Sequence, residues 1–299
     1  MKRLLLMILL ALSVLTFCAG AETTENTSGF YRYILLEDGS AMITGYDGLE
    51  ETLAIPAAVD GHTVTAIDEG AFYSCTSLET VIIPQGVQTI GDFAFEACTT
   101  LTTVHIPQSV TELGLNPFLC CSALRYIVLP SEHPTLAVVD GVLYSRTDNR
   151  LICYPLAMAA QRFSVPQGTE AIGAFAFYHA KALQEISLSG SVMTLDESAF
   201  EGCSALVKIA LPEGVTAIGP RAFAWCTTLT ELRLPETVQE IGAEAFLFSR
   251  SLTRVTLPDD VQTIGEDAFS WCPKVQLAAK PGTAAAQWAL AQGLTVIGK

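Results

Sequence analysis

Val215-Thr-Ala-Ile-Gly-Pro-Arg-Ala-Phe-Ala-Trp-Cys-Thr-Thr-Leu-Thr-Glu-Leu-Arg-Leu-Pro235 is one copy of a unit that recurs along this 299-residue chain. The unit follows the pattern I-G-x-x-A-F-x-x-C-x-x-L-x-x-V-x-L-P, and its phenylalanine, the repeat phenylalanine, stands at positions 72, 95, 118, 177, 200, 223, 246 and 269. These positions are 23 residues apart, except for one interval of 59 residues, which is one period plus 36. A fixed period of this length predicts a solenoid, in which each coil packs only against its neighbours.

Each copy contains two short extended segments and a connecting turn. Leu101-Thr-Thr-Val-His-Ile-Pro107 has apolar residues at the spacing of a leucine-rich-repeat strand, and Pro107 ends it because proline has no N–H to donate. Val87-Gln-Thr-Ile90 predicts the second extended segment. Acidic residues recur just before the repeat phenylalanines and favour a helix start, where N–H groups are free. The unit therefore predicts a leucine-rich-repeat-like solenoid with a parallel β-sheet and short helical turns.

One slot of the unit, three residues after the repeat phenylalanine, holds six of the cysteines: Cys75, Cys98, Cys121, Cys203, Cys226 and Cys272. Ala180 and Ser249 fill this slot in other copies, so the slot requires a small side chain. We expect this cysteine column to consist of free thiols packed in the core. Disulfides between adjacent coils are the alternative, because an exported protein can form them. No C-x-x-C pair occurs, and we expect neither a metal site nor a cofactor.

The first 21 residues are predicted to be a signal peptide. A positively charged start precedes an apolar run over residues 4–17, and small residues follow that suit cleavage after Ala21. The run is short for a membrane span, so none is expected after cleavage. Cys18 leaves a lipoprotein as the alternative, although Phe17 stands where a small residue is expected. Residues 22–29 are predicted to be a flexible lead-in.

Both ends of the solenoid are predicted to be capped, since an uncovered coil would expose an apolar face and a strand edge. Residues 30–60 predict an N-terminal β-hairpin cap, because Asp38-Gly39 separates two β-prone runs. Residues 279–299 predict a C-terminal cap made of a helix, with Thr283 as its N-cap, and a final strand.

The solenoid itself is predicted over residues 61–278, with an insert at residues 131–166 that accounts for the 36 extra residues. Val138–Tyr144 and Arg150–Pro155 predict the two strands of a β-hairpin around a turn at Thr147–Asn149. A hairpin of this size cannot hold a core alone, so we expect it to pack on the solenoid.

Composition and motifs argue against several classes of function. The formal net charge of -15 and the pI near 4.6 would repel nucleic acid. The four histidines are scattered, and the chain contains no H-E-x-x-H, no G-x-S-x-G and no phosphate-binding glycine loop. Neighbouring carboxylates recur at the same positions of successive copies, where helix starts are expected. We therefore expect them to lie on a solvated face. The sequence therefore predicts that the protein is not an enzyme.

Over residues 30–299, the pattern resembles the BspA-type (Treponema pallidum-type) leucine-rich repeat family. Val139–Tyr144, Cys153–Pro155 and Pro281–Gly293 are similar to the insert and tail of that family. The chain departs from the pattern at Leu195-Asp196, Asn116-Pro117-Phe118, Ala180 and Ser249. The resemblance implies a secreted or surface protein, often of host-associated bacteria, and characterised members are adhesins that bind host proteins or other microbes.

A second slot, two residues after the repeat phenylalanine, varies between copies. Earlier copies carry Ser74, Ala97, Cys120, His179 and Gly202 there, whereas the last three carry Trp225, Phe248 and Trp271. Adjacent coils lie about 4.8 Å apart, so these last three rings should form one continuous aromatic stripe. The stripe is either a contact surface for a partner protein or glycan, or a set of rings that pack on one another or on the cap.

A third slot, on the strand, alternates in charge: Glu185, Lys208, Glu231 and Arg254. Opposite charges on adjacent strands contribute about 0.2–1 kcal/mol a pair, so we favour a structural role for this column. We therefore predict an exported, adhesin-like binding protein with a protein or glycan partner that contacts Trp225, Phe248 and Trp271. The alternative is a structural or spacer protein of the cell envelope with no ligand of its own.

Overall fold

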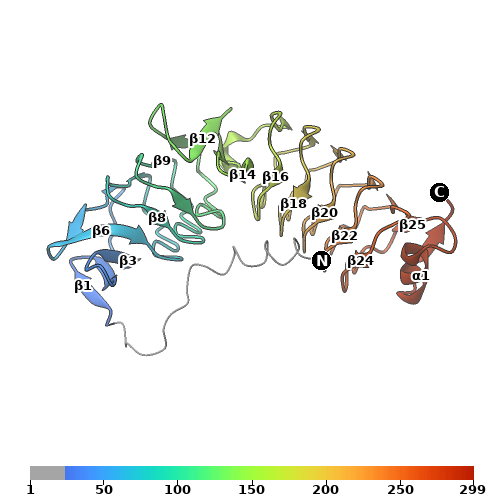
Figure 1. The fold of residues 1–299 in the computed structure, drawn as a ribbon, viewed down its shortest axis with the longest axis horizontal. Coiled ribbons are helices and arrows are strands. Elements are labelled where there is room, and N and C mark those ends of the chain that lie inside the picture. The colour runs from blue at the N-terminus through green and yellow to red at the C-terminus, as the bar shows by residue number, and fades with distance from the viewer. Residues whose placement is uncertain (1–23) are drawn as a thin grey trace.

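Short strands repeated every coil wind into a β-solenoid in the computed structural model, which describes residues 24–299. The solenoid curves into an arc, with β1 and β3 at one end and helix α1 at the other (Figure 1). The predicted signal peptide and Cys18 lie outside the described residues.

The N-terminal half of the arc contains two sheets. The first has the order β1-β2-β3-β6-β8-β10, with β5 paired to β6, and comprises β1 (Asn26–Ser28), β2 (Tyr31–Leu35), β3 (Ala41–Tyr46), β5 (Ala58–Val59), β6 (His62–Ile67), β8 (Thr89–Ile90) and β10 (Glu112–Leu113). The second has the order β11-β9-β7-β4 and comprises β4 (Thr52–Ala54), β7 (Thr80–Ile82), β9 (Thr103–His105) and β11 (Tyr126–Val128).

The C-terminal half contains three sheets. The longest comprises β12 (Leu136–Val139), β13 (Val142–Ser145), β14 (Arg150–Cys153), β16 (Ala171–Ile172), β18 (Thr194–Leu195), β20 (Ala217–Ile218), β22 (Glu240–Ile241) and β24 (Thr263–Ile264). The other two comprise β15 (Arg162–Ser164), β17 (Glu185–Ser187) and β19 (Lys208–Ala210), and then β21 (Glu231–Arg233), β23 (Arg254–Thr256), β25 (Gln276–Ala278) and β26 (Thr295–Ile297). A short 3-10 helix, η1, spans Leu156–Met158.

Strands of successive coils pair in parallel and are offset by one period. Val81 lies opposite Val104, and Val104 lies opposite Ile127. Leu101, Val104 and Ile106 are buried, as the leucine-rich-repeat spacing requires. The predicted solenoid with a parallel sheet is confirmed.

The segments around the repeat phenylalanines are turns and not the short helices that the acidic residues suggested. The residue two positions after each repeat phenylalanine has a φ between 57° and 72°. The residue two positions before it also has a positive φ in every copy except at Asn116. Because a left-handed residue stands on each side of the repeat phenylalanine, alternate N–H groups point to the next coil. Arg221 donates to the Ala243 carbonyl (2.9 Å), Phe223 to that of Ala245 (2.7 Å) and Trp225 to that of Leu247 (2.7 Å). A helix would use these donors within its own coil, so helix-start residues did not predict the conformation.

The repeat phenylalanines stack inside the solenoid as a core ladder. Neighbouring ring centroids lie 4.8 to 5.7 Å apart within each half of the arc. Tyr46 begins the ladder against Phe72, and Trp288 of the C-terminal cap ends it against Phe269. Tyr154, one period before Phe177, packs against it in a tilted arrangement, with ring centroids 5.2 Å apart. The insert therefore ends in an additional coil in which tyrosine replaces the repeat phenylalanine.

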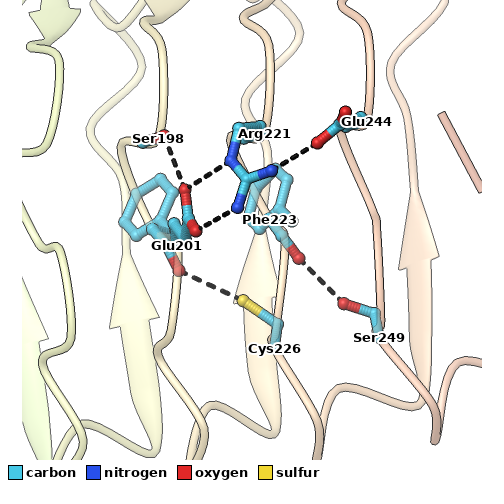
Figure 2. Close-up of polar contacts among 8 residues, drawn as sticks. Ser198, Glu201, Arg221, Phe223, Cys226, Glu244 and Ser249 are labelled. Atoms are coloured by element: carbon cyan, nitrogen blue, oxygen red, sulfur yellow. Dashed lines mark hydrogen bonds and ion pairs between the residues drawn. The ribbon is translucent and has the colours of Figure 1, made fainter. Parts of the chain in front are cut away.

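The cysteine column has a hydrogen-bonding role. The Cys226 Sγ lies 3.2 Å from the Phe200 carbonyl oxygen in the coil before it, and Ser249 Oγ donates to the Phe223 carbonyl at 2.8 Å (Figure 2). Cys98, Cys121 and Cys272 make the same contact with the repeat phenylalanine before them. All eight cysteines within residues 24–299 are free thiols, so the described chain holds no disulfide between coils. Most copies fill the slot with a small side chain that donates this hydrogen bond, which explains serine at 249, whereas Ala180 fills it without a donor.

The insert contains one more strand than predicted. Leu136–Val139 and Val142–Ser145 are separate antiparallel strands joined at Asp140-Gly141, where both residues have positive φ as a tight hairpin turn requires. β14 then pairs in parallel with β16, so it belongs to the solenoid. The two-stranded prediction is corrected because it treated Asp140-Gly141 as the interior of a strand.

The caps differ from the sequence expectation only at the N-terminus. Asn26–Ser28, within the predicted flexible lead-in, forms β1 and pairs antiparallel with β2. The Ser28 hydroxyl donates to the Asp60 carboxylate at 2.7 Å, which holds this edge against the hairpin at Asp60-Gly61. At the other end, Thr283 caps α1 (Ala284–Ala291), and β26 pairs with β25.

The loop between β11 and β12 is organised by His133, which is buried. Its Nε2 lies 3.0 Å from the Pro107 carbonyl oxygen, and the Leu136 N–H donates to its Nδ1 at 3.1 Å. Accepting at Nδ1 and donating at Nε2 is possible only for the neutral ring. Burial lowers the pKa of His133, which agrees with this bonding.

Replacing Ser249 tests the hydrogen bond of the cysteine column. Ser249→Ala removes the donor to a buried carbonyl and should lower the free energy of unfolding by about 1 kcal/mol. Ser249→Cys, the residue most copies use, should have a smaller effect. Urea midpoints of the three proteins measure the difference. Equal midpoints for Ser249→Ala and Ser249→Cys would contradict the bond and leave only a volume requirement.

The lowered pKa of His133 predicts a stability loss in acid. Because the folded-state pKa lies below the unfolded value of about 6.5, the unfolded chain binds the proton first as the pH falls. The contribution of His133 is therefore complete above pH about 6.5 and decreases below it. Thermal melts from pH 8 to 5 should show a steeper decline for the wild type than for His133→Gln. Parallel curves for the two proteins would show that His133 does not titrate in this way.

Candidate interaction site

The aromatic stripe lies on the outer side of the turns that enclose the core ladder. Trp225, Phe248 and Trp271 have φ values of 59°, 59° and 60°, in the left-handed region that bulky residues rarely adopt. The left-handed residue turns its side chain away from the core. Phe223 is therefore buried, while Trp225, two residues later, is partly exposed. The scaffold thus fixes the direction of these side chains but does not require them to be aromatic.

The three rings stack on one another along the solenoid axis. The centroids of Trp225 and Phe248 are 4.2 Å apart with planes 16° from parallel, and those of Phe248 and Trp271 are 5.2 Å apart at 3°. Trp225 is 40% and Trp271 is 68% exposed. The C-terminal cap uses its own tryptophan, Trp288, against the core ladder. The predicted continuous stripe therefore exists: its rings are stacked, both tryptophans are exposed and Phe248 between them is partly buried.

Stacking decides which parts of the stripe can meet a partner. Phe248 is covered on both faces, whereas the stacking covers only one face of Trp225 and one face of Trp271, so the ring edges and one face of each tryptophan are left by the stack. Arg250 lies over the Phe248 ring, with its guanidinium carbon 5.3 Å from the centroid, a favourable cation–π geometry. The aromatic stripe thus presents an apolar surface with the positive Arg250 guanidinium beside it.

The same column continues towards the N-terminus through His179 and Gly202. A Cβ on Gly202 would collide with the His179 imidazole, which therefore occupies the space beside this glycine. The His179 ring also stacks on Tyr178, with centroids 4.3 Å apart and planes 6° from parallel. Burial lowers the pKa of His179. Its neighbours thus fix the histidine ring in the same column, two coils before Trp225.

An ion network lies beside the stripe and was not predicted. The Arg221 guanidinium donates to both Glu201 oxygens, at 3.0 and 2.6 Å, and to Glu244 in the following coil (Figure 2). Ser198 adds a hydroxyl donor to Glu201 at 2.7 Å. Glu201 is buried and is not one of the paired carboxylates before the repeat phenylalanines that were expected to be solvated. The only sequence signal was Ser198, Arg221 and Glu244 at intervals of one period.

The charged strand column has the predicted register but few ion pairs. Glu185 lies opposite Lys208, and Glu231 lies opposite Arg254. The close contact in this column is instead between Arg162 and Glu185, at 3.3 Å on exposed side chains. An exposed pair of this kind contributes little, about 0.2–1 kcal/mol. The column supports strand pairing weakly and gives no sign of a ligand site.

Two kinds of site are missing from residues 24–299. No group of three or more His, Cys, Asp or Glu side chains in this range could hold a metal ion. Among the described residues there is also no helix with the length and apolarity needed to cross a membrane.

Several solved structures share this fold. A leucine-rich cell surface protein of Faecalibacterium prausnitzii A2-165 is 24% identical, with a TM-score of 0.57 over 90% of this chain and 97% of the other. The pneumococcal vaccine antigen PcpA is 16% identical, with a TM-score of 0.61 over 93% and 99%. A leucine-rich repeat protein of Eubacterium ventriosum ATCC 27560 is 23% identical, with a TM-score of 0.61 over 87% and 85%. No curated protein matches the sequence.

The family comparison agrees with the period and with the position of the insert. The model of the BspA type leucine rich repeat region matches residues 53–138 and 153–276, in six copies. The unmatched segment between them contains β13 and the hairpin turns of the insert. The chain therefore belongs to the BspA-type leucine-rich repeat family.

Proposed function

We propose that this protein is a non-catalytic binding protein of the cell surface or the secreted fraction, and that Trp225, Phe248 and Trp271 contact its partner. The observation that carries the proposal is an exposed, stacked aromatic stripe that the solenoid does not need. Ser74, Ala97 and Gly202 occupy the same slot with the same positive φ in other coils. Any residue other than glycine costs about 1–3 kcal/mol in this conformation, so the backbone gives no reason for aromatic rings in three successive coils.

The geometry of the stripe favours a protein partner over a glycan. Sugars stack on exposed ring faces, and stacking within the stripe covers both faces of Phe248 and one face of each tryptophan, with Trp271 the more exposed of the two. Ring edges, the indole N–H groups and the Arg250 guanidinium suit a protein surface with apolar and acidic groups, because Trp and Arg are enriched at the centres of such interfaces. A glycan that engages Trp271 alone is the second form of the proposal.

The proposed location rests on the sequence at the N-terminus and on similar proteins. Residues 1–21 have the composition of an export signal. One protein with this fold is described as a cell surface protein and another as a vaccine antigen, which agrees with an exposed location. An adhesin-like role, with attachment to a host or microbial surface, is the form of binding that we propose.

A structural role in the cell envelope is the competing proposal. The observation in its favour is an elongated arc that is closed by a cap at each end (Figure 1). Deletion that alters the surface layer without loss of attachment would support the structural role. Loss of attachment with an unaltered layer would support binding.

Removing the stripe tests the binding proposal. The double variant Trp225→Ala with Trp271→Ala should weaken binding to surface glycoproteins of host cells by about tenfold or more, since buried Trp contacts dominate interfaces of this kind. Surface plasmon resonance with immobilised glycoproteins, and a glycan array for the second form, measure the change. Tyr73→Ala is the matched control, because Tyr73 is an exposed aromatic in a turn at the opposite end. Equal affinity of wild type and double variant, or equal loss in Tyr73→Ala, would contradict the proposal.

A further inference from the structure

The parallel sheets are interrupted at the insert, and β11 and β12 are two of the strands that have only one neighbour there, as β10 and β15 also do. β11 is the last strand of its sheet and pairs only with β9. β12 is the first strand of the next sheet and pairs only with β13. Figure 1 shows β12 between the parts of the solenoid that carry β9 and β14. The two open strand edges therefore lie in the same region of the molecule.

The hydrogen-bond ladder stops at the open edge of β11. In the coils before it, the residue after each strand donates to the next coil: Ile55 to the Ile82 carbonyl, Ile83 to His105 and Ile106 to Val128, at 3.0 to 3.1 Å. Leu129 holds the equivalent position after β11. Within residues 24–299 its N–H has no acceptor. The backbone of β11 is thus set to pair with one more strand.

The outward side chains of β11 are large and apolar, unlike those of most edge strands. Tyr126 is 57% and Val128 is 40% exposed. The preceding strand, β9, carries Thr103 and His105 in the same columns. Proteins protect exposed edges with charged residues or proline, because an apolar edge invites pairing with another chain. The apolar residues on β11 therefore indicate an edge that is covered in use.

A groove of about 360 Å³ separates the two edges. Residues 127–131 form one wall, residues 136–138 form the other, and Arg146 is the only charged residue that lines it. The Arg146 Nε donates to the Leu136 carbonyl at 2.7 Å, which fixes the guanidinium beside β12. The chain has a net charge of -15, whereas the lining of this groove is mostly apolar and its charged residue is positive.

We propose that this groove binds an extended segment of a partner protein, which adds a strand to β11. The segment would have apolar side chains at alternate positions and an acidic side chain that faces Arg146. Main-chain hydrogen bonds supply affinity in this mode of recognition, and the alternate side chains supply selectivity. A second copy of the chain fits poorly, since two molecules that each carry -15 repel each other. The site is separate from the aromatic stripe and does not depend on it.

Selection from a phage-displayed library of random dodecapeptides tests the proposal on the purified full chain. Enriched peptides should alternate apolar residues and include Asp or Glu, and synthetic versions should bind in fluorescence anisotropy. Val128→Lys places a charge on the open edge and should weaken binding about tenfold or more. Ile82→Lys is the matched control, because Ile82 occupies the same column with 41% exposure in an interior strand, and it should bind as the wild type does. Trp225→Ala with Trp271→Ala should also bind as the wild type does.

Two measurements keep the test independent of how the variants fold. On the wild-type protein, hydrogen exchange at the Leu129 amide should slow when a selected peptide is bound. Peptides with methylated main-chain nitrogens at alternate positions should lose binding. The proposal is overturned if no peptide is enriched, if Ile82→Lys loses as much affinity as Val128→Lys, or if Leu129 exchange does not change.

Discussion

Backbone hydrogen bonds between successive coils are the constraint on which this structure depends. Around each repeat phenylalanine, alternating left-handed residues direct the N–H groups to the carbonyl groups of the following coil, as for Phe223 and Ala245 at 2.7 Å. The chain thereby satisfies its buried polar groups without a regular helix. The same spacing brings the phenylalanines into a stack. It also presses Gly219 so close to the Asp196 backbone that a Cβ there would lie 2.6 Å from the Asp196 carbonyl carbon.

This constraint also determines where the surface is free to vary. Positions that face inward accept little change, since the cysteine column holds only small side chains, most of them donors, and the core ladder holds flat rings. The position two residues after the repeat phenylalanine only has to tolerate a positive φ, and it holds residues as different as Gly202 and Trp225. The aromatic stripe uses that freedom. The open edge of β11 has another origin, because the insert breaks the ladder and leaves a strand without its next neighbour.

The period predicted the architecture because one unit that recurs in eight copies at a fixed period admits few folds. It also predicted that Trp225, Phe248 and Trp271 would lie side by side, since position in the period fixes position on the surface. It did not predict the turn conformation, because acidic residues before Phe95 or Phe246 suit a helix start and a left-handed turn equally well. Tyr154 was missed because tyrosine stood in a slot identified by phenylalanine. The pairing of Arg221 with Glu201 depends on which side chains the turn brings together, and the period alone does not reveal this.

Hydrogen exchange at the Trp225 amide tests this account most directly. Its side chain is 40% exposed and the residue lies in neither a helix nor a strand, yet its N–H donates to the Leu247 carbonyl at 2.7 Å. If ladders between coils hold the solenoid together, this amide should exchange as slowly as those of the buried strands, and the amide of Phe248 should do the same. Exchange at the rate of an ordinary exposed loop would contradict the account and leave side-chain packing as the main source of order.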